Sequence, residues 1–514
     1  MKRIIMTIST LLALTLYASA QYVDQALVLS QQSYGVTARS KAMGSAFGAL
    51  GGDFSSLSIN PAGIAVYRAN EFSFTPDVFH YNRTEATNQG ITADDSKYNF
   101  NIANIGYVGI YHPGDTESGL VSVNFGLGFN RLRNFHQNSL SEAMNSPYSR
   151  MDAFAQNTNG INYNDLVTTD SYDPYYNGIP WESKMAWENY LIDVANPGAG
   201  DNQYNSILYQ GETVNQHYAI QREGYINEYV FSLGANFSNK FYIGATVGID
   251  DLYYRERSTY GEDGGSNGFG NFDYYNYLRT TGVGFNLKFG MIYRPIPQLR
   301  LGAAIHTPTF FNLKENYHSW ISSNLDANVG AGAGSHREET PYGDYKYDLE
   351  TPLRAIGSIA YQFGKKGLLS VDYEYVNYNN IKLRHGSDGY DFYSENQDIN
   401  NYYQSIGNIR VGGEYRVTPA VSLRGGYEYY GSPYKSTVDG VSQPNSNYQH
   451  VTYNGGLGFR FGNANLDIAY GLTDLTRYNY PFKVYDATTG DQIVKPIKYH
   501  TLVHDVMFTM AYRF

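Results

Sequence analysis

The chain has 514 residues and a formal net charge of −11, from 48 acidic and 37 basic side chains. This acidic balance argues against nucleic acid as a partner. The sequence contains no cysteine, which excludes disulfides and thiolate chemistry. It contains 52 Tyr and 53 Gly but only 17 Pro. Tyrosine combines an apolar ring with a polar tip, a combination suited to a membrane–water interface.

Residues 1–20 have the pattern of a secretory signal peptide. Lys2 and Arg3 precede a short apolar stretch, and Ala18-Ser19-Ala20 forms a small-residue cleavage site. The apolar stretch is shorter than the roughly 20 residues that a membrane-spanning helix needs. We therefore predict that the chain is exported and that its mature form begins at Gln21.

The composition of residues 21–70 predicts that they form a compact segment, which is too small to fold alone. The segment is rich in small residues around Gly44, and it contains Asp53 and the sequence Asn60-Pro61-Ala62-Gly63. Proline and glycine fix a turn, and the asparagine side chain can hydrogen-bond to nearby backbone. A piece of this size buries little core of its own. We expect it to act as a plug, supported by the walls of the domain that follows.

From residue 71 to the end, the chain predicts about 14 β-strands of alternating polarity. In the segment 278–294, Val283, Phe285, Leu287, Phe289, Met291 and Tyr293 share one face. Gly284, Asn286, Lys288, Gly290 and Arg294 share the other. The predicted strands cover 71–81, 99–112, 119–133, 227–237, 240–254, 278–294, 299–311, 351–363, 367–378, 405–417, 421–430, 449–461, 464–473 and 500–514.

The lengths of the connections alternate between short turns and long polar loops. Short turns include Pro295-Ile296-Pro297 and Gly462-Asn463. This alternation is typical of transmembrane barrels, in which short turns face the periplasm and long loops face outward. The sequence therefore predicts an all-β protein: a transmembrane antiparallel barrel over 71–514 with the plug in its lumen. We expect it in the bacterial outer membrane, with outer-membrane lipid around it.

One loop, residues 136–226, is long enough to form an extracellular subdomain. Helical patterns occur at 180–195 and at 140–155. In the first of these, Trp181 and Met185 can share one side. Two interpretations remain open: these residues form a groove for an apolar ligand, or they form the core of the loop subdomain.

The last strand alternates strictly and ends on Phe514, with Tyr512 on the same face. A closing strand that ends on an aromatic residue resembles that of a bacterial outer-membrane barrel. We therefore predict that Tyr512 and Phe514 are the signal read by the barrel-assembly machinery.

The sequence from Gly35 to Phe47, together with Asp53 and Asn60-Pro61-Ala62-Gly63, resembles the N-terminal hatch of the long-chain fatty-acid transporter (FadL) family, which includes aromatic-hydrocarbon uptake channels. The resemblance implies passive uptake of a hydrophobic small molecule, with long-chain fatty acids first. Gly44, Asp53 and residues 60–63 would then belong to a moving hatch. In this family the ligand leaves sideways beside a kinked third strand, which makes Gly126 and Gly128 the candidates for the lateral gap.

The alternation places many charged residues on the lumen face, among them Arg354, Arg410 and Arg424. An unpaired arginine would receive a fatty-acid carboxylate, whereas paired arginines would form a structural ladder of ion pairs. Similar numbers of acids and bases favour the ladder. The 11 histidines are scattered, so we predict no metal, no cofactor and no catalytic residues. The alternative function is that of an outer-membrane barrel that contacts proteins, like those serving type IX secretion.

Overall fold

The computed structural model describes residues 22–114, 118–196, 202–209, 211–264, 269–438 and 440–514. The predicted signal peptide, residues 1–20, lies outside them. No helix among the described residues is long and apolar enough to cross a membrane.

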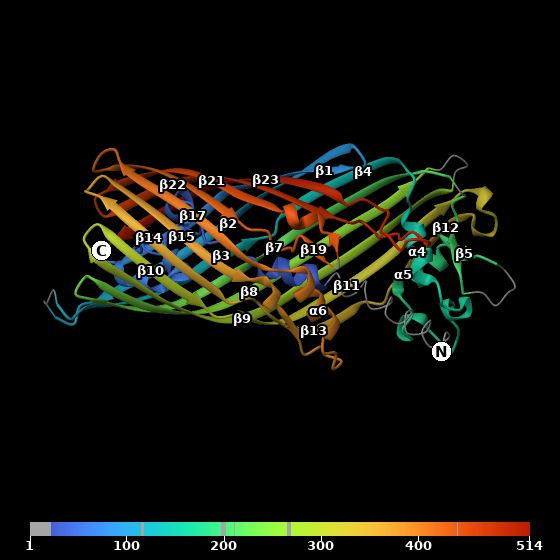
Figure 1. The fold of residues 1–514 in the computed structure, drawn as a ribbon, viewed down its shortest axis with the longest axis horizontal. Coiled ribbons are helices and arrows are strands. Elements are labelled where there is room, and N and C mark those ends of the chain that lie inside the picture. The colour runs from blue at the N-terminus through green and yellow to red at the C-terminus, as the bar shows by residue number, and fades with distance from the viewer. Residues whose placement is uncertain (1–21, 115–117, 197–201, 210, 265–268, 439) are drawn as a thin grey trace.

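The described strands close into a 14-stranded antiparallel barrel (Figure 1), which confirms the predicted fold class. The barrel strands are β1 (Glu71–Asn88), β2 (Ile91–Tyr111), β3 (Leu120–Asn134), β7 (Val214–Phe237), β8 (Phe241–Asp263), β9 (Gly270–Ile296), β10 (Leu299–His306), β14 (Arg354–Phe363), β15 (Gly367–Asn377), β17 (Ser405–Arg416), β18 (Val421–Tyr430), β21 (Gln449–Phe461), β22 (Ala464–Asn479) and β23 (Ile497–Arg513). Pairing of β1 with β23 closes the ring.

Two barrel strands, β10 and β14, are interrupted, and a second strand continues the wall of each toward the extracellular end. β11 (Phe310–Leu325) extends β10, and β13 (Gly343–Glu350) precedes β14. β11 pairs with β9 and β13, so this side of the wall stays hydrogen-bonded above the interruption. β12 (Gly334–Glu339) and β16 (Lys382–Arg384) pair with β11 and β13.

Several strands are longer than their apolar alternation indicates. β1 and β2 form one hairpin that turns at Gln89-Gly90, where the sequence predicts a loop over 82–98. Above the membrane both faces of a strand can be polar, so its period is not visible as an apolar pattern. The extended strands carry the barrel well beyond the membrane on the side of the long loops.

The outward face of the barrel is apolar over the membrane-spanning part. On β9, exposed side chains run from Val283 to Tyr293, with Phe285, Phe289 and Met291 between them. These ten residue steps span about 34 Å along the strand, or about 25 Å of height at a tilt of about 40°. This height matches the apolar band of an outer-membrane barrel.

Residues 22–70, called the hatch below, lie inside the barrel (Figure 1, blue). Residues 22–30 form a helix. The other hatch elements are α2 (Ala38–Ala42), α3 (Ser56–Ile59) and the 3₁₀ helix η1 (Pro61–Val66). Thr37 caps α2, and Asn60 caps η1 with Pro61 at its first position. The buried apolar residues of the hatch pack against one another and against the strands, so that Phe47 and Ile59 share a cluster with Ile356 of the wall.

The long loop forms a cap over the extracellular end of the barrel. It contains β4 (Gln137–Ser146), α4 (Arg150–Thr158), η2 (Tyr163–Leu166), η3 (Pro174–Tyr176), α5 (Trp181–Glu188), β5 (Ile192–Val194) and β6 (Tyr204–Ser206). The prediction of a helix over 140–155 is wrong for its first half, because β4 pairs with β7 there. α4 begins instead after Ser149, which forms a capping box with Asp152.

The remaining described elements lie in other extracellular loops. They are η4 (Ala327–Gly332), η5 (Tyr378–Asn380), α6 (Tyr393–Tyr402), β19 (Thr437–Val438), β20 (Val441–Ser442) and η6 (Pro444–Asn447).

Candidate transport pathway and its hatch

Glycines on the inner wall let the hatch backbone approach the strands closely. A Cβ atom at Gly412 of β17 would overlap the carbonyl oxygen of Met43, and one at Gly426 of β18 would overlap the amide nitrogen of Gly44. Gly44 itself has φ +57°, a conformation that side chains disfavour. The predicted hatch residue Gly44 therefore lies at a backbone-to-backbone contact with the wall.

Asn60 joins two parts of the hatch to the wall. Its side-chain amide donates hydrogen bonds to the Gly48 carbonyl at 2.6 Å and to the Met291 carbonyl of β9 at 3.1 Å. Its Oδ1 accepts from the Ala62 amide at 3.1 Å. Pro61, Ala62 and Gly63 are buried in η1, and Gly63 lies against Gly51. The gating role of residues 60–63 stays a prediction, but they lie where the hatch meets the wall.

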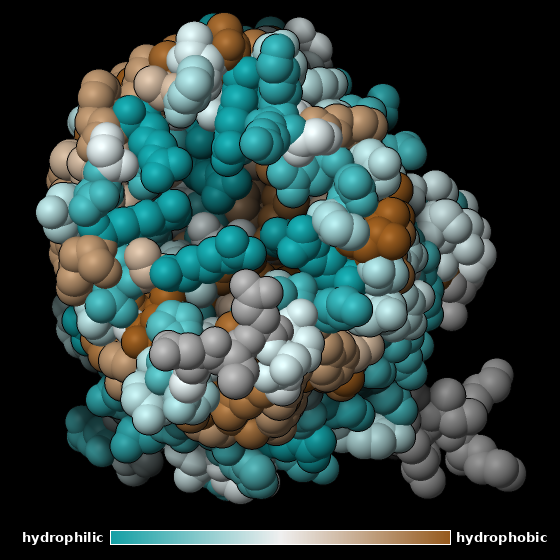
Figure 2. Space-filling model, turned by 90° about the vertical axis from the view of Figure 1, so that its left-hand side faces the viewer, coloured by the Kyte–Doolittle hydropathy of each residue, from teal (hydrophilic) through white to brown (hydrophobic). Residues whose placement is uncertain are grey.

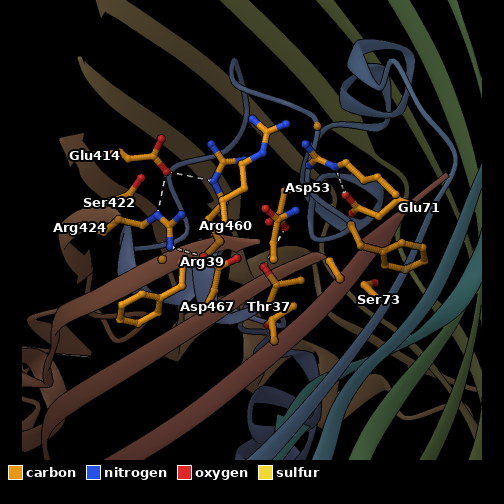
Figure 3. A pocket seen from close by; sticks show the side chains of 18 of the residues that line it. Thr37, Arg39, Asp53, Glu71, Ser73, Glu414, Ser422, Arg424, Arg460 and Asp467 are labelled. Carbon is orange, nitrogen blue, oxygen red and sulfur yellow. Dashed lines mark hydrogen bonds and ion pairs between the residues drawn. The ribbon is translucent and has the colours of Figure 1, made fainter. Parts of the chain in front are cut away.

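Asp53 holds the hatch together internally. Its Oδ1 accepts hydrogen bonds from Thr37 Oγ1 at 2.8 Å, from Ser55 Oγ at 2.6 Å and from the Ser55 amide at 3.0 Å. Asp53 also lines a pocket of about 130 Å³ between the hatch and the strands near the end with the short turns (Figure 3). Hydrophilic side chains surround a hollow on this face of the molecule (Figure 2).

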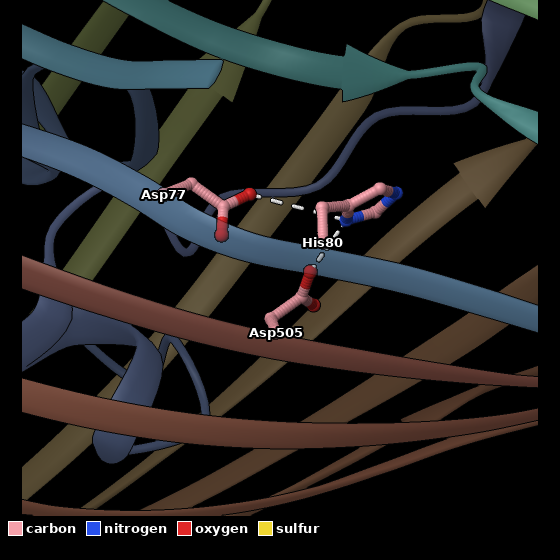
Figure 4. A group of neighbouring side chains, drawn as sticks. All are labelled: Asp77, His80 and Asp505. Atoms are coloured by element: carbon pink, nitrogen blue, oxygen red, sulfur yellow. Dashed lines mark hydrogen bonds and ion pairs between the residues drawn. The ribbon is translucent and has the colours of Figure 1, made fainter. Parts of the chain in front are cut away.

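A charged cluster ties α2 to the wall. Lys41 donates to Asp505 of β23 at 2.9 Å, and the other Asp505 oxygen lies 2.6 Å from His80 Nδ1 (Figure 4). Asp77 lies 3.9 Å from the same His80 nitrogen. Burial lowers the pKa of Lys41 and the Asp505 carboxylate raises it; the carboxylate prevails, so Lys41 remains a cation. Asp77, His80 and Asp505 have the spacing of a metal site. However, the ammonium group already neutralises Asp505, so we interpret the cluster as an ion-pair contact of the hatch.

The three predicted ligand-binding arginines each lie beside acids. Arg354 is 3.2 Å from Glu374, and Arg424 is 2.7 Å from Glu414 and 2.6 Å from Asp467. Arg410 is fully buried, 3.6 Å from Glu374. The cross-strand register sets these partners side by side, as in the ladder that the sequence favours. Their binding role stays a prediction.

Two lumen arginines that the sequence analysis missed have no ion-pair partner among the described acids. Arg133 donates to Gln31 at 3.4 Å and lies over the Phe135 ring, with 5.9 Å between Cζ and the ring centroid. Arg477 donates to Gln137 at 2.9 Å. A register shift between Arg131 and Arg133 points Arg133 inward, and β22 extends past its predicted end at 473 to reach Arg477.

A cluster of buried apolar side chains, called the apolar chamber below, lies in the lumen between the hatch contacts and the cap. Its walls come from many strands: Leu132, Ile226, Leu252, Leu278, Phe311, Leu313, Leu349 and Val376. The helix of residues 22–30 occupies it, with Val23, Ala26 and Leu27 against the walls. An apolar layer inside an otherwise polar lumen is unusual for a water-filled pore.

Trp181 and Met185 lie in the cap, not in the chamber. Met185 is fully buried in the apolar core of the cap. Trp181 donates from its ring nitrogen to the Tyr175 carbonyl at 3.1 Å, and its ring lies 5.6 Å from that of Tyr317. This placement favours the interpretation as a subdomain core over that of a ligand groove.

Gly126 and Gly128 lie in an unbroken ladder between β2 and β3, opposite Val108 and Gly106. Cβ atoms there would meet the hatch side chains of Leu57, Ile64 and Phe54, so the glycines make room for the hatch. The β2–β3 ladder ends further along, at Asn104 and Asn130. Beyond that point β2 pairs only with β1 within the described strands, and β4 packs near both of them. The role of Gly126 and Gly128 in a lateral gap stays a prediction.

Deleting Phe514 is expected to lower the yield of assembled barrel by about tenfold, because the terminal residue completes the closing seam. Its amide donates to the Asn70 carbonyl at 3.1 Å, and its exposed ring lies 6.3 Å from Tyr107 and 6.2 Å from Tyr512. The heat-modifiable band on cold gels of outer-membrane fractions measures assembly. Phe514→Tyr serves as the matched control; equal yields for the deletion and this control would contradict the assembly role.

A closed barrel with an apolar outer band, an internal hatch and an apolar cluster in the lumen has the architecture of an outer-membrane channel. The family model for outer-membrane transport proteins, OMPP1/FadL/TodX, matches residues 230–514. Because this match covers more than half of the chain, the protein belongs to that family and to the outer membrane.

Solved structures show the same fold. A FadL homologue of Pseudomonas aeruginosa aligns with a TM-score of 0.53 and 13% identity over 93% of this chain and 98% of its own. The P. putida toluene transporter TodX aligns with a TM-score of 0.53 and 13% identity over 94% of this chain and 99% of its own. No curated protein matches the sequence.

Proposed function

We propose that the protein takes up hydrophobic small molecules passively, with long-chain fatty acids as the ligand. The observation that carries this proposal is the apolar chamber, which would offer a water-excluded site at mid-lumen once the helix of residues 22–30 leaves it. The helix of residues 22–30 is its resident occupant. An acyl chain can replace Val23, Ala26 and Leu27 on the same walls, because apolar burial is not directional.

The unpaired lumen arginines favour an anionic ligand over a plain hydrocarbon. Arg133 and Arg477 offer guanidinium groups that no described acid neutralises. A carboxylate bound by a guanidinium forms a charge-assisted hydrogen bond. Arg354, Arg410 and Arg424 are less suited, because a ligand would have to displace Glu374, Glu414 or Asp467.

The proposal is tested by binding of a fluorescent long-chain fatty acid to the detergent-purified protein, competed with oleate and with oleyl alcohol. Combined Arg133→Gln and Arg477→Gln substitutions are expected to weaken oleate binding about tenfold or more, since each lost charged hydrogen bond is worth about 1.5–3 kcal/mol. Oleyl alcohol lacks the carboxylate, so its binding is expected to change little. Arg460→Gln, at an exposed position near the short turns, is the matched control.

Different results would separate the alternatives. Equal loss for oleate and oleyl alcohol would contradict the carboxylate role while keeping a hydrophobic ligand. No saturable binding of either compound would contradict the uptake proposal. It would favour the second candidate, a barrel that contacts exported proteins through its large cap.

A further inference from the structure

The outward face of strands β8, β9, β11 and β13 carries a group of bases just above the apolar band. On β8, β9 and β11 these bases lie an even number of residues from Ile249, Val283 and Phe310, which are exposed on the outer face below them. The bases therefore also point outward. Arg279 lies four residues beyond Val283, about 10 Å higher at a tilt of about 40°. This is the height of lipid headgroups, not of the acyl chains. We call Arg255, Arg257, Arg279, Lys314 and Lys346 the basic patch.

The register places like charges directly opposite each other twice within the basic patch. Arg255 of β8 faces Arg279 of β9, and Lys314 of β11 faces Lys346 of β13. Directly opposed like charges destabilise a sheet unless an anion lies between them. Two such pairs on four neighbouring strands suggest a partner that brings negative charge.

Acids of the protein neutralise only part of the basic patch. Glu223 pairs with Arg255, and Asp344 lies 2.6 Å from Lys314. Arg279 donates to the neutral Asn316 side chain at 2.7 Å. In the described part of the chain no ion pair joins Arg257, Arg279 or Lys346 to a carboxylate, and all three are exposed. Three bases of the patch therefore have no ion-pair partner among the described acids.

Aromatic rings continue the same surface upward. Tyr275 and Trp320 stack with their centroids 4.8 Å apart, and His318 stacks on Tyr342 at 4.1 Å. Tyr342 is 84% exposed. In the register Trp320 faces Tyr275, which lies about 20 Å above Val283 at a tilt of about 40°. Tyr275 and Trp320 are half-buried, and Arg337 lies over the Trp320 ring with 5.1 Å between Cζ and the centroid, so Tyr342 offers the exposed ring of this group. An exposed ring far above the acyl chains has an apolar face and a polar edge, which suits the face of a sugar ring.

We propose that this face binds an outer-leaflet glycolipid with a phosphorylated sugar headgroup. Phosphates would bind the basic patch, acyl chains would lie on the apolar band below, and the sugars beyond the phosphates would stack on the exposed ring of Tyr342, next to His318 and Trp320. Each layer of such a lipid meets a matching layer of the protein. A phospholipid has no sugars that reach the rings, and free phosphate has no acyl chains for the band.

The test uses the full-length mature protein in detergent, with lipid A, lipopolysaccharide that carries its core sugars, phosphatidylglycerol and inorganic phosphate as probes. Native mass spectrometry measures bound lipid. Combined Arg257→Gln, Arg279→Gln and Lys346→Gln substitutions are expected to weaken lipid A binding by about tenfold or more. The matched control removes three exposed lysines at short turns: Lys240→Gln, Lys365→Gln and Lys366→Gln. Heat-modifiable migration confirms that both variants are folded.

Trp320 supplies a second, independent readout. In a Trp181→Phe, Trp187→Phe background it is the remaining tryptophan, because the sequence contains 3. Its fluorescence is expected to shift with lipopolysaccharide but not with lipid A, phosphatidylglycerol or inorganic phosphate. Equal lipid A affinity of the patch variant and its control would overturn the proposal, as would equally tight binding of phosphatidylglycerol. Competition by inorganic phosphate alone would assign the patch to free anions.

Discussion

Valine at both Gly412 and Gly426 is expected to open the plugged barrel. The two glycines face each other on β17 and β18 and accept the backbone of Met43 and Gly44. A side chain at either position would overlap hatch backbone, so one partner must move. The wall is fixed by continuous ladders on both sides, whereas the hatch is held by scattered side-chain contacts. We therefore expect the hatch to move away from its contact with β17 and β18.

Single-channel conductance in planar bilayers measures this opening. We expect it to rise by about tenfold or more, since a 14-stranded barrel without its plug is wide enough for water. The chain offers a close control in the neighbouring pair Gly413 and Gly425, which are also opposite each other. Their Cβ atoms would lie 3.7 Å and 4.0 Å from the nearest neighbours, with no hatch atom among them. Similar conductance for the two valine pairs would show that the contact at Gly412 and Gly426 does not keep the hatch in the lumen.

The strands within the membrane were predictable because their environment forces a two-residue period. Lipid requires apolar residues on one face, and the lumen tolerates Lys288 or Arg410 on the other. Where a strand leaves the membrane, this constraint ends. The β1–β2 hairpin above residue 81 and β4 were therefore missed, and 140–155 was predicted as a helix. The pair Ser149 and Asp152 did signal the true start of α4.

The partners of charged residues depend on register, which one sequence does not reveal. Glu414 and Arg424 are ten residues apart and meet only because β17 and β18 align in one way. Shifting the register by one residue would turn every side chain to the opposite face. Similarly, Arg133 faces the lumen through an irregularity in β3. The residue pattern predicts a ladder of ion pairs in the lumen, but it does not show which arginines are left outside the ladder.

Lys288→Met is expected to lower the free energy of unfolding by about 3–5 kcal/mol, because it leaves buried carboxylates without their cation. Lys288 forms an ion pair with Glu228, and both are almost completely buried in the wall. Asp250 is buried nearby, and Asn286 donates to it at 3.3 Å. Glu228 also accepts from Ser58 of the hatch at 2.5 Å. The cation therefore stabilises both the wall and the point where α3 contacts it.

Denaturant unfolding in detergent, followed on cold gels, measures the loss. Lys240→Met removes an exposed lysine from a short turn and is expected to change stability by less than about 0.5 kcal/mol. Adding Glu228→Gln to Lys288→Met should recover much of the loss, because it removes the uncompensated charge while keeping an acceptor for Ser58. If Lys288→Met were as stable as Lys240→Met, the lysine could not be the counter-ion of this cluster. If the double variant were no better than the single one, the lost stability would come from the packing of the lysine side chain, not from its charge.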